Sequence, residues 1–177
     1  MILTGFSDLS ALHAAILTQA GCVSLHSPTI AMSYVYDDDR ITKDGHELFM
    51  KIITTTEPLG SMNSQLNFDQ VEAWKKGKAK GQLIGGNLAV FAGIQGSKYF
   101  PDPNGKILFL EDLSENPYKL DRLMTQLRLS GYLDQLNGIL LGHFTDCDSD
   151  DPERGGWKEA IQSCLKVRER SAPIKRY

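Results

Sequence analysis

Residues 106–131, KILFLEDLSENPYKLDRLMTQLRLSG, carry the pattern that decides the predicted fold. Their first five residues form a mostly apolar run that is typical of a buried strand. Asn116 and Pro117 follow as an N-cap and a proline at the first helical position. The next apolar residues recur at helical spacing, up to a glycine that is expected to end the helix: Leu120, Leu123, Met124, Leu127 and Gly131. This stretch therefore predicts a buried strand followed by an amphipathic helix.

The same alternation of strands and helices extends to both sides of this stretch. Further strands are predicted at 22–26, 71–74, 79–84 and 138–141, and further helices after Asp8, after Thr42, at 87–94 and at 155–167. The lysine-rich residues 75–78 are expected to join two of these strands as a hairpin turn, and 54–67 has the composition of a linker or domain boundary. Alternating strands and helices predict an α/β fold.

The helix expected after Asp8 carries an apolar stripe on one face. Its members lie at i, i+3, i+7 and i+8, and Gly21 is a natural stop: Leu9, Leu12, Ile16 and Leu17. We expect this stripe to be partly exposed, which would favour self-association.

The bulk composition excludes several classes of protein. The 177 residues are 41% hydrophobic and 23% charged, which is ordinary for a globular protein. The formal net charge of -3 is too small to indicate a nucleic-acid or membrane partner. No apolar run approaches the roughly 20 residues of a membrane helix, and the first residues lack the features of a secretory signal. A cytoplasmic location is therefore predicted.

Neither the cysteines nor the acidic clusters predict a metal site. Cys22, Cys147 and Cys164 are odd in number and far apart, so three reduced, buried or half-buried thiols are expected. The acidic run 146–150 starts like a calcium loop but lacks its glycine and its final glutamate, and 37–39 is expected to be a solvated turn. The four lysines of 75–80 are interpreted as a solvated edge rather than a nucleic-acid site.

Gly5-Phe6-Ser7-Asp8 is the first candidate for chemistry. A serine between a short apolar strand and a helix can have its hydroxyl exposed on a sharp turn, close to N–H groups that could bind an oxyanion. The motif is incomplete, because Leu9 stands where the usual G-x-S-x-G elbow has glycine. From these residues alone, a helix cap at Ser7 or Asp8 is the favoured interpretation.

Glu111 and Asp112 are the second candidate, because they directly follow the predicted strand 106–110. Active-site groups of α/β proteins gather at the carboxyl ends of strands, where a glutamate can orient a histidine. The alternative is an acidic loop leading into the next helix, with Glu115 placed near the positive end of that helix. The residues alone leave both interpretations open.

Gly85-Gly86-Asn87 is the third candidate. Its spacing matches neither phosphate-binding glycine motif, so close backbone packing explains the paired glycines better. Four histidines, His13, His26, His46 and His143, show no metal-ligand spacing.

Taken together and in order, these motifs resemble the LD-carboxypeptidase family of serine peptidases, which includes the microcin C immunity peptidases. The matching stretches are 5–13, 81–88, 106–112, Pro117-Tyr118, Asp121-Arg122, Gln126-Leu127 and 138–142. The likeness runs from residue 5 to about residue 165.

The resemblance implies roles for particular residues. Ser7 would be the nucleophile and Glu111 the triad acid, with the backbone N–H of Asp8 as an oxyanion donor. Gly85, Gly86 and Asn87 would shape the neighbouring pocket. The implied reaction is hydrolysis of the amide between an L-centre and a terminal D-residue, such as the D-alanine of muropeptides during cell-wall peptidoglycan recycling. No metal or organic cofactor is implied, and a homodimer is possible.

The resemblance also implies the domain organisation. Residues 1–58 would be the C-terminal remnant of a flavodoxin-like, parallel-sheet nucleophile domain. Residues 59–177 would be an incomplete α/β C-terminal domain with a small mixed or barrel-like sheet.

Two parts of the family pattern find no match in this sequence. Only four residues precede Gly5, where the family has a glycine-rich segment, and His143 is the only histidine after Glu111 and lies in a different motif from the family's triad histidine. We therefore expect a chain truncated at both ends and essentially inactive by itself. The rival hypotheses are a non-catalytic remnant that binds a peptide or partner chain, and a different hydrolase that recruits His26 or His143.

Overall fold

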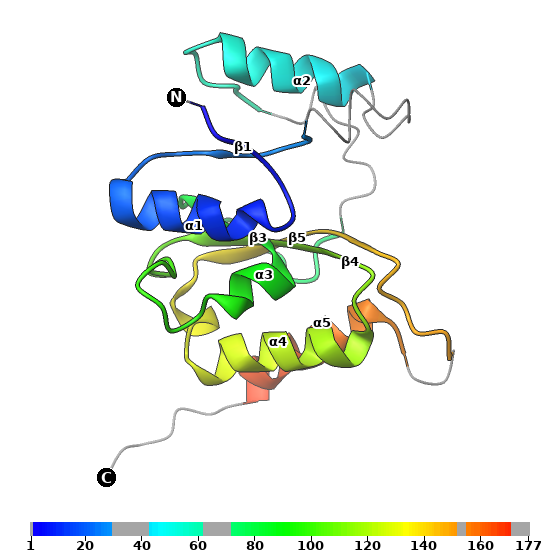
Figure 1. Cartoon of the computed structure of the whole chain (residues 1–177). Coiled ribbons are helices and arrows are strands. Elements are labelled where there is room, and N and C mark those ends of the chain that lie inside the picture. Colours follow the sequence, from blue (N-terminus) through cyan, green and yellow to red (C-terminus); the bar gives the residue numbers. More distant parts are fainter. Residues whose placement is uncertain (1, 30–42, 62–71, 152–154, 171–177) are drawn as a thin grey trace. The chain divides into compact units, whose positions relative to one another are not determined.

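The computed structural model describes residues 2–29, 43–61, 72–151 and 155–170, and these form two compact units (Figure 1). The first unit comprises Met1–Phe6 and Ser24–Lys78, and the second comprises Ser7–Val23 and Ala79–Tyr177. The units interleave in sequence, since the first helix of the chain folds with the C-terminal residues. The domain boundary near residue 58 stays a prediction.

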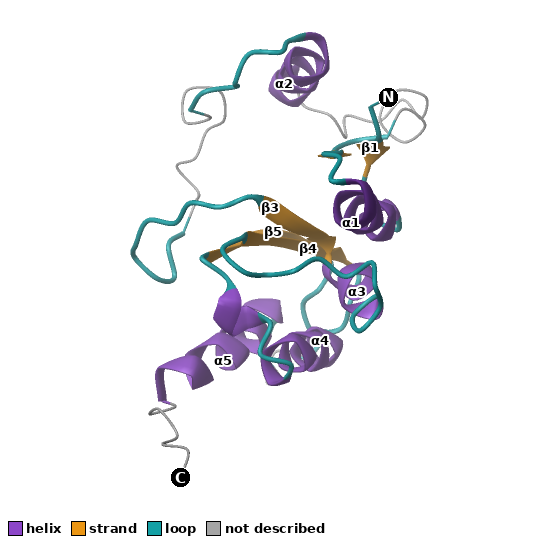
Figure 2. Ribbon diagram, turned by 90° about the vertical axis from the view of Figure 1, so that its left-hand side faces the viewer, coloured by secondary structure: helices purple, strands orange, loops and turns teal. Residues whose placement is uncertain are grey.

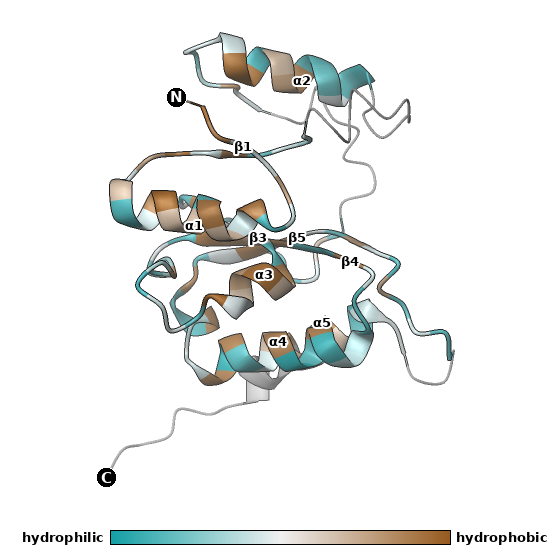
Figure 3. Ribbon diagram, in the orientation of Figure 1, coloured by the Kyte–Doolittle hydropathy of each residue, from teal (hydrophilic) through white to brown (hydrophobic). Residues whose placement is uncertain are grey.

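The first unit contains two short strands and one helix. Strand β1 (Thr4–Gly5) pairs in parallel with β2 (Leu25–His26), and α2 (Lys43–Thr54) follows. The predicted strand 22–26 is thus shorter than expected, because only its last two residues find a partner, while Cys22 and Val23 are exposed. Helix α2 mixes apolar and hydrophilic residues, and none of them is buried (Figure 3).

The second unit is a three-stranded parallel sheet with helices on one face (Figure 2). Its elements are α1 (Leu9–Ala20), β3 (Leu83–Asn87), α3 (Leu88–Gly93), β4 (Ile107–Leu113), α4 (Pro117–Leu129), the 3-10 helix η4 (Leu133–Gln135), β5 (Gly138–Thr145) and α5 (Trp157–Arg170). The strand order is β3-β4-β5, and α3, α4 and α5 lie on the same side of the sheet. The predicted α/β fold is confirmed; the sheet, expected to be mixed or barrel-like, is parallel throughout the described residues.

The core lies between the sheet and these helices. Alternate residues of β4, Leu108 and Leu110, are fully buried on the helix side, together with the apolar stripe that the sequence predicted on α4: Leu120, Met124 and Leu127. Phe144 of β5 stacks on Trp157 of α5 with ring centroids 4.6 Å apart. The segment 106–131 therefore forms the strand and the helix that it predicted.

The lysine-rich hairpin was a wrong prediction. Residues 72–82 contain no strand, and the strand that follows begins at Leu83; Val71 lies outside the described residues, as do Thr42 and the turn 37–39. Residues 83–87 pair with β4 instead, and only Gln82 extends that ladder, by accepting a hydrogen bond from Ile107. The four lysines are exposed, as a solvated segment requires.

Helix α1 buries a different face from its apolar stripe. Its buried residues are Ser10, His13 and Ala14, whereas Leu12 is 50% exposed. Small side chains let the helix approach β3 and α3 closely, and the Gln19 amide and Thr18 hydroxyl donate to the carbonyls of Lys98 and Tyr99. The apolar stripe thus remains partly exposed, in line with the expectation from the sequence.

None of the helices in the described residues is both long and apolar enough to cross a bilayer.

Candidate active site

Ser7 lies between β1 and α1, two residues after the strand and two before the helix. Its φ is 60°, in the left-handed region that costs a non-glycine residue about 1–2 kcal/mol. The residue is exposed, and its carbonyl accepts a hydrogen bond from Ser10 N–H at 2.9 Å. The strand-to-helix turn predicted from the sequence is therefore present, and its backbone is strained at the serine.

The alternative role as a helix cap finds little support at Asp8. This residue occupies the N-cap position of α1, but its side chain makes no capping hydrogen bond. Its φ and ψ of -55° and -26° are already helical, whereas an N-cap residue usually has extended dihedral angles.

The first turn of α1 is attached to the end of β3 through Ser10. The Ser10 side chain is fully buried, and its hydroxyl oxygen accepts a hydrogen bond from the backbone N–H of Asn87 at 2.9 Å. This contact joins residues 77 positions apart in the sequence. It brings the helix turn that follows Ser7 to the carboxyl end of β3.

Gly85, Gly86 and Asn87 form the second half of β3, and Asn87 is also the N-cap of α3. A side chain at Gly85 would overlap the carbonyl oxygen of Phe109 on β4, and the φ of Gly85 is 122°. The close-packing interpretation of the paired glycines is therefore confirmed at Gly85. Helix α3 then starts at Leu88, one residue later than predicted.

Asn87 and Glu111 are direct partners across β3 and β4. Glu111 lies within β4, because the predicted strand 106–110 continues to Leu113. On the other side of β4 the pairing with β5 shifts register between Leu110 and Asp112. There Gly142 leaves space for Glu111, since a Cβ on the glycine would lie 3.3 Å from the Glu111 Cβ.

Partial burial changes the acidity of Glu111. Its pKa is raised from 4.5 to about 6, first by loss of solvation and second by the neighbouring negative charge of Asp112. Perturbed carboxyl groups of this kind are found at catalytic sites, although structural carboxylates can also be shifted.

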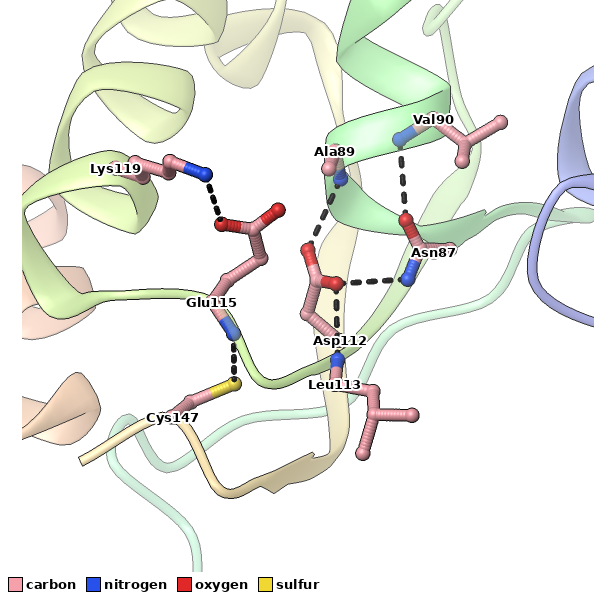
Figure 4. Close-up of polar contacts among 8 residues, drawn as sticks. All are labelled: Asn87, Ala89, Val90, Asp112, Leu113, Glu115, Lys119 and Cys147. Atoms are coloured by element: carbon pink, nitrogen blue, oxygen red, sulfur yellow. Dashed lines mark hydrogen bonds and ion pairs between the residues drawn. The ribbon is translucent and has the colours of Figure 1, made fainter.

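Asp112, named with Glu111 in the sequence as a strand-end carboxylate, has a role in the site that the sequence did not predict. It is 3% exposed, and its carboxylate accepts three hydrogen bonds (Figure 4): from Asn87 Nδ2 at 2.8 Å, Leu113 N at 2.9 Å and Ala89 N at 3.0 Å. The available signal was strand alternation, because Asp112 shares its side of β4 with the buried Leu108 and Leu110.

Glu115 and the acidic loop near α5 have structural partners. Glu115 forms an ion pair with Lys119 at 3.0 Å, and its N–H donates to Cys147 Sγ (Figure 4). Asp148 accepts a hydrogen bond from Trp157 N at the start of α5, so this residue of the incomplete calcium loop caps a helix. Burial raises the pKa of the Cys147 thiol, which makes it less reactive.

A surface pocket of about 620 Å³ lies elsewhere, at the N-terminal ends of α4 and α5. None of the residues predicted for the site lines it. The predicted residues lie instead just before α1 and in the second halves of β3 and β4.

Two of the predicted site residues, Asn87 and Glu111, pair across β3 and β4, and Asn87 also binds Ser10 in the helix that follows Ser7 and Asp8. Such an arrangement has the parts of an acyl-transfer site: an exposed serine on a strained turn, N–H groups of a helix start, and a carboxylate able to orient a base. His143, the histidine that follows Glu111 in sequence, lies exposed on β5, and His13 is buried in α1. Fold and site together define an α/β protein with a strained strand-to-helix turn and a perturbed carboxyl group in its parallel sheet.

A family model described as the LD-carboxypeptidase C-terminal domain matches residues 80–175. This match covers more than half of the chain, so the chain belongs to the LD-carboxypeptidase family.

Individual relatives agree with this family. The chain is 36% identical over 149 residues to a probable murein peptide carboxypeptidase of Bacillus subtilis, covering 82% of this chain and 44% of the relative. It is 29% identical over 163 residues to the microcin C7 self-immunity protein MccF of Escherichia coli, covering 80% and 47% respectively. The crystal structure of the muramoyltetrapeptide carboxypeptidase of Oxalobacter formigenes superposes with a TM-score of 0.71 at 28% identity, covering 94% of this chain and 54% of that one. The chain thus spans about half the length of the relatives that it matches.

Proposed function

We propose that this chain carries the nucleophile and the triad acid of a serine-type LD-carboxypeptidase. Ser7 attacks the carbonyl carbon of the substrate amide, and a histidine base takes its proton. The backbone N–H of Asp8 binds the oxyanion, and Glu111 orients the histidine and stabilises its charged form. The charged histidine gives this proton to the leaving amine, whose expulsion leaves an acyl-serine that water then hydrolyses.

One observation carries this proposal: the contacts that run from the turn bearing Ser7 to Glu111. Ser10, one helical turn after Ser7, binds the backbone of Asn87, and Asn87 pairs with Glu111. These contacts support the assignment of Ser7 and Glu111 to one site. The left-handed φ of Ser7 supports the same interpretation, because backbone strain is concentrated at functional sites.

The proposed substrate is a muropeptide, cleaved between an L-centre and its terminal D-residue. The relative with 36% identity is named a probable murein peptide carboxypeptidase, which supports this class of substrate. The proposed location is the cytoplasm, from the sequence features described above, and the proposed assembly is a homodimer, from the family resemblance. No metal is proposed to take part.

The test compares two preparations on an L,D-linked tetrapeptide, with release of D-alanine as the readout. One is the 177-residue chain itself, and the other is a hybrid in which residues 5–165 replace the matching part of the Bacillus subtilis relative. Turnover by the hybrid should fall by about 10⁴-fold or more in Ser7→Ala, and strongly in Glu111→Gln. Ser114→Ala is the matched control, because Ser114 also has a positive φ, of 56°.

The outcomes separate the hypotheses. Turnover by the hybrid that survives Ser7→Ala would refute the assignment of the nucleophile. Comparable Ser7-dependent turnover by both preparations would show that the chain supplies its own base, and alanine variants of His26 and His143 would then identify it. Binding of the tetrapeptide without turnover in either preparation would favour the non-catalytic alternative.

A further inference from the structure

We propose that Asp112 is a positioning residue of this site: its buried carboxylate holds in place the first turn of α3 and the carboxamide of Asn87, the residue that pairs with Glu111 across β3 and β4. The inference rests on the proposed function, because it concerns how the groups of that site are held. It is carried by four hydrogen bonds and by the burial of both side chains (Figure 4).

The orientation of the Asn87 carboxamide is determined by its two neighbours. Its Nδ2 donates to Asp112 Oδ1 at 2.8 Å, and its Oδ1 accepts from Val90 N–H at 3.1 Å. A flipped amide would place its NH₂ group against the N–H of Val90 and its oxygen against the carboxylate. Only one orientation therefore satisfies both contacts.

Asp112 completes this arrangement because its carboxylate offers acceptors alone. Each of its three partners is an N–H donor, and a carboxylate offers acceptors on both oxygens. An asparagine at this position would turn one of those oxygens into an NH₂ group. That group would then face the N–H of Ala89, or those of Asn87 and Leu113.

Asn87 is the residue through which this constraint reaches the proposed catalytic groups. Its backbone N–H binds Ser10 in the first turn of α1, and its place on β3 is opposite Glu111 on β4. A shift of Asn87 would therefore move the helix that follows Ser7 and change the surroundings of Glu111. Displacements of about 1 Å at such sites can lower rates about 100-fold.

Asp112 also acts on Glu111 through its charge. Burial makes the larger contribution to the raised pKa of Glu111, and the negative charge of Asp112 adds to it. Around Glu111, β3 and α3 carry no titratable side chain, β5 carries His143, and α1 carries His13. Removing the charge of Asp112 should therefore lower the Glu111 pKa toward 4.5 without reaching it, since burial remains.

The first experiment uses the 177-residue chain and needs no turnover. NMR would follow the Glu111 carboxyl titration and the exchange of the Ala89 amide in wild type, Asp112→Asn and Asp102→Asn. Asp102 is the matched control, an exposed aspartate that accepts a hydrogen bond from Asn104 N–H at 3.0 Å. In Asp112→Asn alone, the Glu111 midpoint should fall below 6 and Ala89 exchange should rise about tenfold.

An unchanged Glu111 midpoint together with unchanged Ala89 exchange in Asp112→Asn would overturn the proposal. If that variant does not fold, the wild-type chain still decides the question. The Asn87 side-chain NH₂ should exchange far more slowly than that of the exposed Asn104, and equal rates would refute the contact.

The second experiment is a double-mutant cycle in the hybrid. Asp112→Asn should lower kcat about 10- to 100-fold with little change in KM, and should move the acid limb of the kcat/KM profile to lower pH. In an Asn87→Ala background, Asp112→Asn should have little further effect. If instead the two substitutions lower kcat independently, and each loss parallels a fall in melting temperature, the role of Asp112 is merely structural and the proposal is overturned. A hybrid without Ser7-dependent turnover would refute the proposed function, whereas the NMR result would still decide the role of Asp112.

Discussion

At the scale of single residues, Ser7 combines an exposed hydroxyl with a backbone conformation that disfavours any side chain. Ser7→Gly should relieve this strain and raise the free energy of unfolding by about 0.5–1 kcal/mol, because glycine tolerates a positive φ. The same change should abolish turnover in the hybrid. Urea denaturation and D-alanine release would measure the two effects.

Ser114→Gly is the control for that prediction. Ser114 has nearly the same φ, 56° against 60°, but is not proposed to take part in catalysis. It should gain similar stability and keep its turnover. A large loss of stability in Ser7→Gly would mean that the serine side chain stabilises the fold, and that this role rather than catalysis explains the serine at position 7.

The raised pKa of Glu111 predicts a pH-dependent cost to stability. The folded state favours the protonated carboxyl, so the stabilising contribution is complete below pH 4.5 and is lost as the pH rises through about 6. Above that range the ionised carboxylate destabilises the folded state. Glu111→Gln should therefore stabilise the chain at pH 8 by about 1 kcal/mol after allowance for solvent screening.

Denaturation of wild type and Glu111→Gln at pH 4 and pH 8 would check this. The stability gain should nearly vanish at pH 4, where the wild-type carboxyl is mostly protonated in both states. Equal gains at the two pH values would contradict the assignment, since they would indicate a packing effect unrelated to ionisation.

At the scale of elements, the approach of β3 to β4 depends on the absence of a side chain at Gly85. Gly85→Ala would force a Cβ into the Phe109 carbonyl and impose a φ unsuited to alanine, so a loss of about 3 kcal/mol or more is expected. Displacement of β3 would also move Asn87 away from Glu111, and turnover should fall with stability. Thermal denaturation and the tetrapeptide assay would measure both losses.

Gly93→Ala is the matched glycine substitution. Gly93 ends α3, and a Cβ there would meet nothing within 4 Å. Its replacement should be neutral or stabilising by up to about 1 kcal/mol, as for a helical glycine. Comparable losses in the two variants would mean that the β3–β4 contact is not the cause.

At the scale of the whole molecule, several large apolar side chains remain exposed. Leu83 of β3 and Leu140 of β5 are 59% and 47% exposed, and the sheet register places them on the face opposite the buried Leu108. We expect concentration-dependent self-association of the chain through this face. Sedimentation velocity over a range of concentrations would detect it, and Leu83→Lys with Leu140→Lys should reduce it.

Leu129→Lys is the control for self-association. Leu129 is 75% exposed at the end of α4, and its replacement removes a similar apolar area elsewhere on the second unit. It should leave the association unchanged. A wild-type chain that remains monomeric throughout would refute the expectation.

The sequence alone determined those features that depend on neighbours along the chain. Helical spacing and the Asn116-Pro117 start predicted α4, the apolar run predicted β4, and the order of motifs predicted the family. The turn at Ser7 was also predicted, because a strand, a short polar step and a helix follow one another there.

Only the tertiary structure decided which residues meet across the chain. The lysine-rich hairpin failed because 83–87 pairs with β4 rather than with residues just before it, and a strand's partner is set by the whole sheet. The buried face of α1 and the role of Asp112 were missed for the same reason: Ser10 and Asp112 are polar, and only their partners, Asn87 and Ala89, make their burial favourable. Hydrogen bonds between residues 23 to 77 positions apart leave no periodic signal in the sequence, so they were visible only once the chain was folded.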